Sequence, residues 1–265
     1  MSRTPRIIHY CWFGGNPLPA LALKCIKSWR KHCPDCEIIE WNEDNFNVNY
    51  NNYTKEAHSA GKWAFVSDVA RLWAVYSMGG VYFDTDVELL QPIDDLLCGG
   101  MFIGFESDEH INTGQGFGAE KGFWLIKALL DAYNGISFIN PDGTLNTTPC
   151  TVHNTNAMRR EGFVINNSMQ VINGAAVYPS EYFCPKDIKT GVLSMTVNTR
   201  AIHHFDGSWL SAEQRREHEI VTGYRRKYGK PLGEALYIMG ALCTLRRTAL
   251  WNIIGKLKCR IIRTK

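Results

Sequence analysis

One stretch in the first third of the chain, Ser67–Glu88, constrains the fold more than any other (SDVARLWAVYSMGGVYFDTDVE). Its apolar residues recur at helical spacing, which predicts a buried helix. Gly79 and Gly80 predict the end of that helix, because glycine adopts a left-handed cap at almost no cost. The run Val81–Phe83 is too short for a helix and consists of strand formers. The stretch therefore predicts a helix, a tight turn and a short strand, as in an α/β protein.

Two carboxylates, Asp84 and Asp86, follow that strand. Side chains alternate along a strand, so we expect both to point to one face and Thr85 to the other. Two ionised carboxylates about 4 Å apart repel by roughly 4 kcal/mol at an effective dielectric constant near 20. The pair therefore favours a divalent cation as its counter-charge.

Two charged residues on the preceding helix, Asp68 and Arg71, lie three positions apart and so share one face. Unpaired charge is costly in so apolar a segment. They are either a local ion pair at the helix surface or part of a site that includes the paired aspartates. The Gly-Gly turn and the Asp-x-Asp pattern that follow favour the second interpretation.

Together, Asp68-x-x-Arg71, Gly79-Gly80-Val81-Tyr82 and Asp84-Thr85-Asp86 resemble the signature of glycosyltransferases with a sugar-binding Asp-x-Asp motif. The nearest group is family 32, which includes capsular polysaccharide transferases and yeast mannosyltransferases. PRIIHYCWFGG near the N-terminus and HHFDGSW near residue 205 fit the same pattern, so the resemblance covers most of residues 5–210. It implies a GT-A-type nucleotide-diphospho-sugar transferase domain over residues 1–232, with a mostly parallel central sheet flanked by helices.

The resemblance also implies a reaction: metal-dependent transfer of a hexose from a nucleotide sugar, with UDP as the expected nucleotide, to a glycan hydroxyl. The expected setting is surface polysaccharide synthesis, with retention at the anomeric carbon and an acceptor that is lipid-linked or free. The implied catalytic residues are Asp68, Arg71, Asp84 and Asp86. The implied donor-binding residues are His9, Trp12, Asp68, Arg71, Asp84, Asn112, Gln115, Ser208 and Trp209.

The metal, Mn²⁺ or Mg²⁺, is expected on Asp86 and His204, with Asp84 beside them. Adjacent residues of a strand point to opposite faces, so only one of His203 and His204 can join the aspartates. The resemblance selects His204, because His204-Phe205-Asp206-Gly207 matches the segment that supplies the third ligand in related transferases.

Four of the implied donor residues also have a purely structural interpretation. His9 and Trp12 end the first predicted strand, Arg6–Trp12, where an aromatic ring either stacks on a nucleotide base or belongs to the core. Asn112 and Gln115 lie in a glycine-rich segment, Asn112–Gly118, that we expect to be a loop. Their amides either bind sugar hydroxyls or belong to a plain turn.

Charge is unevenly distributed along the chain. Ala235–Lys265 contains seven Lys or Arg and no acidic residue, whereas the preceding residues carry 22 basic and 26 acidic side chains. A nucleic-acid partner is disfavoured, because its basic surface would belong to the body of the protein. Residues 233–265 predict a basic amphipathic helical appendage, which either contacts an anionic membrane or packs on the domain.

The predicted location is cytoplasmic, with peripheral contact at the inner face of the cell membrane as the alternative. The chain has no run of about 20 apolar residues, its N-terminus lacks the apolar core of a signal peptide, and its nine cysteines are scattered. Two other functions are compatible with part of the pattern. A haloacid-dehalogenase-like phosphohydrolase also begins with a strand and Asp-x-Asp, but Glu88 departs from that pattern. A non-catalytic glycan-binding scaffold would be expected to lose some of the charged residues.

Overall fold

The computed structural model describes residues 4–207 and 212–239. The chain divides into two compact units. The first comprises Met1–Lys186 and Leu193–Trp209, and the second comprises Asp187–Val192 and Leu210–Lys265. The expected appendage, residues 233–265, lies largely outside the described residues. Within them, α6 (Ala212–Tyr228) is followed by a helical stretch over residues 230–239.

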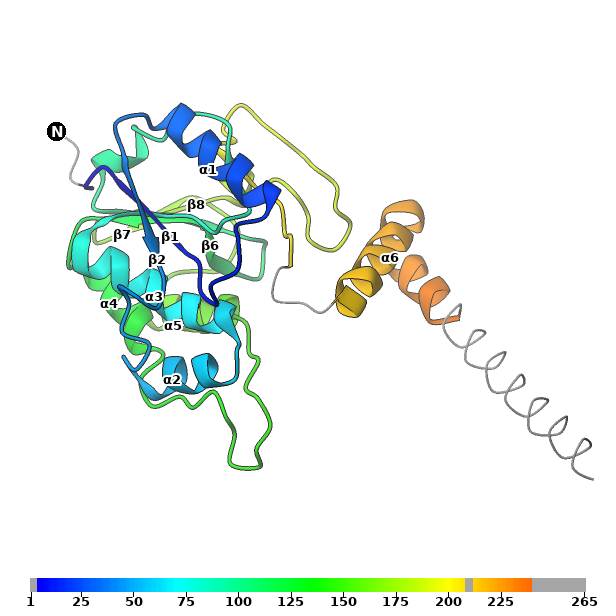
Figure 1. The fold of residues 1–265 in the computed structure, drawn as a ribbon. Coiled ribbons are helices and arrows are strands. Elements are labelled where there is room, and N and C mark those ends of the chain that lie inside the picture. Colours follow the sequence, from blue (N-terminus) through cyan, green and yellow to red (C-terminus); the bar gives the residue numbers. More distant parts are fainter. Residues whose placement is uncertain (1–3, 208–211, 240–265) are drawn as a thin grey trace, which may run out of the picture. The chain divides into compact units, whose positions relative to one another are not determined.

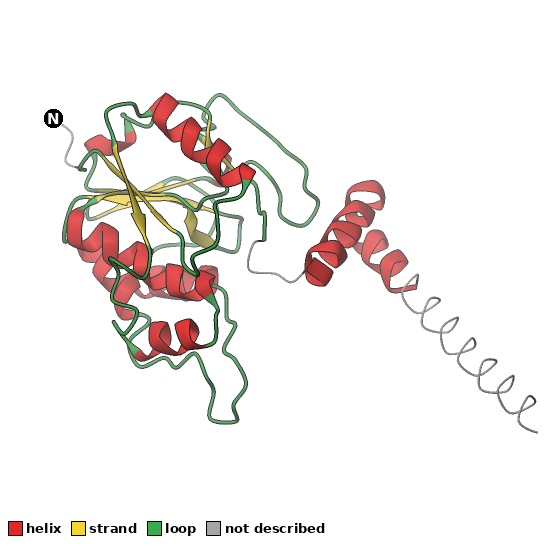
Figure 2. Cartoon of the chain, viewed as in Figure 1, coloured by secondary structure: helices red, strands yellow, loops and turns green. Residues whose placement is uncertain are grey.

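The first unit is built on a central sheet with the strand order β2-β1-β3-β6-β5-β8-β7 and a small two-stranded sheet of β4 and β9 (Figures 1 and 2). The strands of the central sheet are β1 (Ile7–Cys11), β2 (Glu37–Trp41), β3 (Gly80–Tyr82), β5 (Met101–Phe105), β6 (Ile111–Ala119), β7 (Gln170–Ile172) and β8 (Ala175–Tyr178). The small sheet pairs β4 (Val87–Leu89) with β9 (Ala201–His203) in antiparallel register.

Helices cover both faces of the central sheet. Figure 1 shows α1 on one face and α2 to α5 on the other. Their bounds are α1 Ala20–His32, α2 Asn52–Ser59, α3 Trp63–Met78, α4 Trp124–Asp131 and α5 Cys150–Arg160. Two apolar clusters correspond to these layers: one contains α1 residues such as Trp29, and the larger one contains α3 residues such as Leu72. The predicted class, an α/β sheet flanked by helices, is confirmed.

Helix α3 ends as its sequence predicts. Gly79 caps it with φ 71°, and Gly80 begins β3 with φ 106°. A Cβ atom on Gly80 would lie 2.7 Å from the carbonyl oxygen of Ile7. Glycine is therefore needed here both for the backbone conformation and for the close approach of β3 to β1.

The sheet is less parallel than expected. Of the described pairings in the central sheet, β1 with β2, β1 with β3 and β5 with β8 are parallel. The pairings of β3 with β6, β5 with β6 and β7 with β8 are antiparallel. The main reason is β6, because its residues Asn112–Gly118 form a buried central strand rather than the expected loop.

Strands β7 and β8 form a hairpin, in which Asn173 and Gly174 turn the chain with φ 46° and 81°. Strand β9 is short and ends at His203. Beyond it, Phe205 adopts φ 57°, a conformation that a strand cannot continue through.

Candidate active site

The paired aspartates lie in a turn that links the central sheet to the small one. The amide of Val87 donates to the carbonyl of Asp84 at 3.0 Å, and the amide of Asp84 donates to the carbonyl of Gly114 on β6 at 2.9 Å. The expectation of an extended strand with alternating side chains is therefore wrong at Asp84–Asp86. The turn brings the two carboxylates together by curling the backbone.

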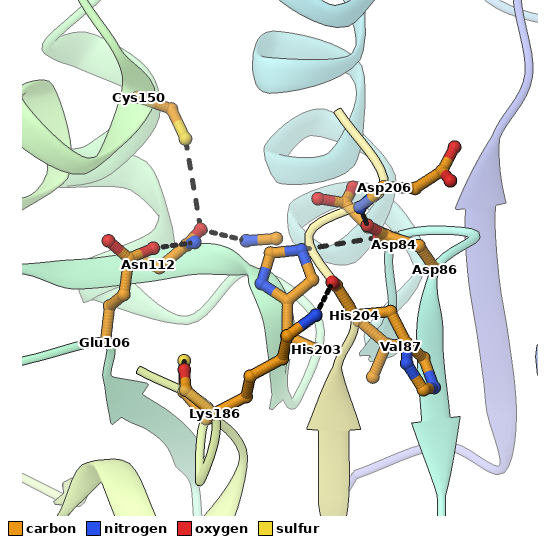
Figure 3. A network of polar contacts seen from close by, with 12 residues as sticks. Asp84, Asp86, Val87, Glu106, Asn112, Cys150, Lys186, His203, His204 and Asp206 are labelled. Carbon is orange, nitrogen blue, oxygen red and sulfur yellow. Dashed lines mark hydrogen bonds and ion pairs between the residues drawn. The ribbon is translucent and has the colours of Figure 1, made fainter. Parts of the chain in front are cut away.

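A histidine from β9 completes a cluster with these aspartates (Figure 3). One ligand atom each from Asp84, Asp86 and His203 lie within 4.8 Å of one another. The Nε2 atom of His203 is 3.3 Å from Oδ1 of Asp86. The cluster joins a turn and a strand that are more than a hundred residues apart in the sequence, because β4 and β9 pair with Val87 opposite His203.

The structure places His203 in the cluster, not His204, which corrects the sequence prediction. The Nε2 atom of His204 lies 2.9 Å from Oε2 of Glu88, which also pairs with Lys24 at 2.7 Å. In the antiparallel register, Glu88 is opposite Ile202, so alternation along β9 directs His204 to the face of Glu88. Only one histidine faces the aspartates, as expected, but the register selects the other one.

The charge balance of the cluster rests on Asp86 and His203. Burial disfavours the charge on Asp86, but the charge and hydrogen bond of His203, together with the amide of Asp206 at 2.8 Å, lower the pKa of this carboxyl to about 2. Burial likewise opposes the charge on His203, but Asp86 outweighs it and raises the pKa of the imidazole. Without a metal the two form an ion pair, so a cation would have to displace the imidazole proton.

The cluster fits the expected divalent cation. Carboxylate oxygens and an imidazole are suitable ligands for Mn²⁺, and Mg²⁺ also accepts carboxylate oxygens. Among the described residues, the buried Nδ1 atom of His203 has no hydrogen-bond partner. The Nε2 atom is the one that faces Asp86, so the fit to a cation rests on the three ligand atoms of the cluster.

The charged pair on α3 is buried beside the cluster. Asp68 is 6% exposed and Arg71 is 4% exposed. Nη2 of Arg71 lies 2.7 Å from Oδ1 of Asp68 and 3.5 Å from Oδ1 of Asp84. The surface ion pair is therefore excluded, and Arg71 bridges the helix and the turn. Nη1 of Arg71 is buried without a partner in the described part of the chain, so a donor points into the site with nothing to bind.

The pKa of Asp68 is raised, whereas that of Asp86 is lowered. Removal from water raises the pKa of the Asp68 carboxyl to about 6, although the charge of Arg71 opposes this shift. A carboxylate with such a pKa accepts hydrogen bonds from neutral hydroxyls near neutral pH and is protonated in mildly acidic solution.

The two amides on β6 have different environments. Nδ2 of Asn112 donates to Oε2 of Glu106 at 2.6 Å, and its Oδ1 accepts from the amide of Gly114 at 2.6 Å and lies 3.9 Å from the thiol of Cys150 (Figure 3). Gln115 is fully buried and donates to the carbonyl of Phe105 at 2.8 Å. The structure brings Asn112 to the site and ties Gln115 to the neighbouring strand.

Of the remaining predicted donor-binding residues, His9 belongs to the core and Trp12 lines a hollow. His9 is fully buried, with Nε2 2.8 Å from the carbonyl of Gly79 and Nδ1 accepting from Trp41 at 3.1 Å. It is therefore a core residue, because both ring nitrogens are occupied, and burial lowers its pKa. Trp12 lines a hollow of about 430 Å³ beyond the ends of β1 and β2, together with Gly15, Asn16, Glu40, Asn42, Glu43 and Asp44. Ser208 and Trp209 lie outside the described residues.

Sequence reasoning missed several residues of this site. Glu106 follows β5, Cys150 begins α5, and the Nζ atom of Lys186 donates to the carbonyl of His204. Glu106 and Lys186 are charged residues in ordinary loop positions, without a motif. No pattern in the sequence pointed to the thiol of Cys150.

A mixed α/β sheet with an Asp-x-Asp turn beside a buried Asp–Arg pair is the arrangement expected of the glycosyltransferase class. Residues 19–102 match the family described as the glycosyltransferase sugar-binding region containing a DXD motif. Residues 19–102 are therefore similar to the sugar-binding region of this glycosyltransferase family, which favours a transferase over a phosphohydrolase.

The chain is similar to inositol phosphoceramide mannosyltransferase 1 of Schizosaccharomyces pombe, with 32% identity over 110 residues. The match covers 39% of this chain, and it spans about a third, 34%, of that relative's length. Among solved structures, the PaToxG glycosyltransferase has a TM-score of 0.47 and 16% identity, covering 60% of this chain and 69% of its own. A glycosyltransferase involved in the glycosylation of the major capsid of PBCV-1 has a TM-score of 0.42 and 14% identity, covering 81% and 99%. In the described part of this chain, no helix has the length and apolarity to cross a membrane.

Proposed function

We propose that this protein transfers a hexose from a nucleotide sugar, with UDP as the nucleotide, to a hydroxyl of a glycan in surface polysaccharide synthesis. The observation that carries the proposal is the convergence of Asp84, Asp86 and His203 beside the buried pair Asp68 and Arg71. A cation site next to a buried hydrogen-bonding pair suits a donor that has a diphosphate at one end and hydroxyls at the other.

Asp84, Asp86 and His203 would hold Mn²⁺ or Mg²⁺, which when bound stabilises the charge of the departing nucleoside diphosphate as a Lewis acid. Arg71 keeps its charge at any working pH and presents its unpartnered Nη1 to a sugar or phosphate oxygen. Asp68, ionised above about pH 6, accepts a hydrogen bond from a sugar hydroxyl.

Asn112 would supply a further contact to the sugar. Glu106 and Gly114 hold its amide from both ends, so its orientation is set before the donor arrives. Binding energy is then not spent on ordering this side chain. Trp12 would stack on the nucleotide base. Two observations support this role: Trp12 lines the hollow beyond β1, and β1 and β3 are parallel neighbours whose carboxyl ends meet at one edge.

A donor screen tests the proposed activity. The protein is incubated with Mn²⁺ and a panel of UDP- and GDP-sugars, and the released nucleotide is measured, with a chelator as the control. We expect release of UDP from a hexose donor, abolished by the chelator. Release of GDP would retain the transferase and refute the choice of nucleotide, and release from no donor would refute the activity.

Retention at the anomeric carbon is proposed from the family resemblance. The product of the preferred donor and a simple sugar acceptor is examined by proton NMR, in which the anomeric coupling constant reports the new linkage. The donor's configuration in the product is the expected result, and the opposite configuration would refute retention.

The basic tail supports a membrane-bound acceptor. Ala235–Lys265 carries seven Lys or Arg without an acidic residue, and each basic residue near an anionic surface contributes about 1 kcal/mol of binding. The name of the relative above refers to a lipid, which agrees with a lipid-linked acceptor at the cytoplasmic face. Deleting residues 235–265 should abolish sedimentation with anionic liposomes and leave donor hydrolysis intact. A full-length protein that ignores such liposomes at low salt would refute this part.

A further inference from the structure

The carboxylate of Asp84 is held by Tyr82, the last residue of β3, which precedes the turn. The hydroxyl of Tyr82 donates to Oδ1 of Asp84 at 2.8 Å. Tyr82 is 1% exposed, and its ring packs between the guanidinium of Arg71, 5.1 Å from the ring centroid, and the ring of Phe117, 5.9 Å away. A phenylalanine would fill the same space, so the packing does not explain the hydroxyl. The hydrogen bond to Asp84 does explain why a hydroxyl is present here.

The second oxygen of the same carboxylate occupies space that a glycine leaves open. A Cβ atom on Gly114 would lie 2.1 Å from Oδ2 of Asp84 and 3.0 Å from Nη1 of Arg71. The backbone of Gly114 is within β6, outside the left-handed region, so its conformation alone does not demand glycine. Glycine is needed because the carboxylate of Asp84 occupies the space that a Cβ atom would fill.

These two contacts keep the carboxylate of Asp84 from forming a closer ion pair with Arg71. The side chain of Asp84 is 28% exposed and lies in a turn, where its carboxylate can rotate. Arg71 is 3.5 Å away and has one nitrogen without a partner in the described residues. A two-point Arg–carboxylate pair is the strong alternative. If it formed, both groups would be withdrawn from a ligand.

We propose that the Tyr82 hydroxyl and the Cβ-free surface of Gly114 are positioning elements that keep Asp84 directed at a divalent cation and keep Arg71 available. The inference rests on the proposed metal-dependent function. It extends the site to two residues that hold Asp84 from the side of the central sheet, whereas Asp86 is held from the side of β9 by His203 and the amide of Asp206.

The test is the binding of Mn²⁺ alone, measured from the electron paramagnetic resonance signal of the free ion without any nucleotide sugar. Tyr82→Phe should weaken Mn²⁺ binding about 10- to 100-fold, the range seen when groups that orient a metal ligand are lost. Gly114→Ala should weaken it at least as much, with the near-ultraviolet circular dichroism of the parent as the sign of an intact fold.

Tyr10→Phe is the matched control. Tyr10 is also a buried strand tyrosine that donates to a carboxylate, Oε2 of Glu40, at 2.5 Å, but it does not contact the cluster. It should leave Mn²⁺ binding unchanged. Parental Mn²⁺ affinity in Tyr82→Phe, with a lowered unfolding midpoint, would show a merely structural hydroxyl and overturn the inference. A parent protein that binds no Mn²⁺ would instead refute the metal-dependent function, and the inference with it.

Discussion

The two groups of charged residues in this site are stabilised in different ways, and the pKa values of their carboxyls shift in opposite directions. On α3, Asp68 and Arg71 are buried deeply and neutralise one another at 2.7 Å, and burial raises the pKa of Asp68 to about 6. In the turn after β3, Asp86 is stabilised by His203 and a backbone amide, which lower its pKa to about 2. The helix pair is suited to neutral hydroxyls, and the turn cluster is suited to a cation.

The difference follows from where each group is in the fold. A helix in the core offers few free backbone amides, so a carboxylate there has to rely on another side chain. A turn leaves its backbone amides free, so a backbone donor and a histidine can together stabilise the charged form of Asp86. Substitutions in either group should therefore affect different properties of the protein.

The largest effect is expected on stability, from the helix pair. Arg71→Ala leaves the buried carboxylate of Asp68 without its cation and should lower the free energy of unfolding by about 3–5 kcal/mol. Chemical denaturation measures this loss. Lys127→Ala, which breaks an exposed pair with Asp131 on α4, should have little effect.

A double variant sharpens the first prediction. Arg71→Ala alone leaves the charge of the Asp68 carboxylate buried and unpaired. Combining it with Asp68→Asn removes that charge, so the double variant should recover part of the lost stability. If the double variant were as unstable as the sum of the two single variants, the pair would not be coupled and the comparison would fail.

The turn cluster should control metal binding. Asp86→Asn should weaken Mn²⁺ binding by about 100-fold or more, because it removes a ligand and not only a group that orients one. Glu88→Gln, the same change two residues further on, should leave Mn²⁺ affinity near that of the parent. Isothermal titration with Mn²⁺ measures both, and equal losses would mean that the general negative charge, not the cluster, attracts the ion.

The two adjacent histidines provide the next comparison. His203→Ala should raise the Mn²⁺ concentration for half-maximal donor hydrolysis by about 100-fold, because His203 is itself one of the proposed ligands. His204→Ala should raise it little, because His204 pairs with Glu88. The reverse result would restore the assignment that the sequence favours.

The last comparison concerns pH. Asp68 has a pKa of about 6 in the folded protein, above the ordinary value of 3.8, so between these values the folded state binds more protons than the unfolded chain. Its contribution to stability therefore decreases as pH rises through that window, by roughly 3 kcal/mol over the whole window. Unfolding of metal-free parent and Asp68→Asn protein from about pH 4 to 6 tests this. The variant should lack this part of the slope, and parallel curves would contradict the prediction.

Much of the fold could be predicted because it depends on local patterns. The buried helix that ends at Gly79 and the short strand after it agree with expectation, since periodicity and glycine conformation act within a few residues. The segment Asn112–Gly118 could not be predicted as a central strand. Its glycines weaken strand propensity, and only the neighbours explain them: a Cβ atom on Gly116 or Gly118 would meet Phe83 or Phe102 within 3 Å.

By itself the sequence determined which charged residues form the candidate site. Asp68, Arg71, Asp84 and Asp86 were identified from their spacing and their apolar surroundings, and all four lie in one site. Only the tertiary structure decided how they are arranged. The register of β9 against β4 chose His203 over His204, the packing against Trp41 and Gly79 made His9 a core residue, and the chain folded the aspartates into a turn. These outcomes depend on contacts between segments distant in the sequence, and a one-residue change in strand register exchanges the faces of every side chain.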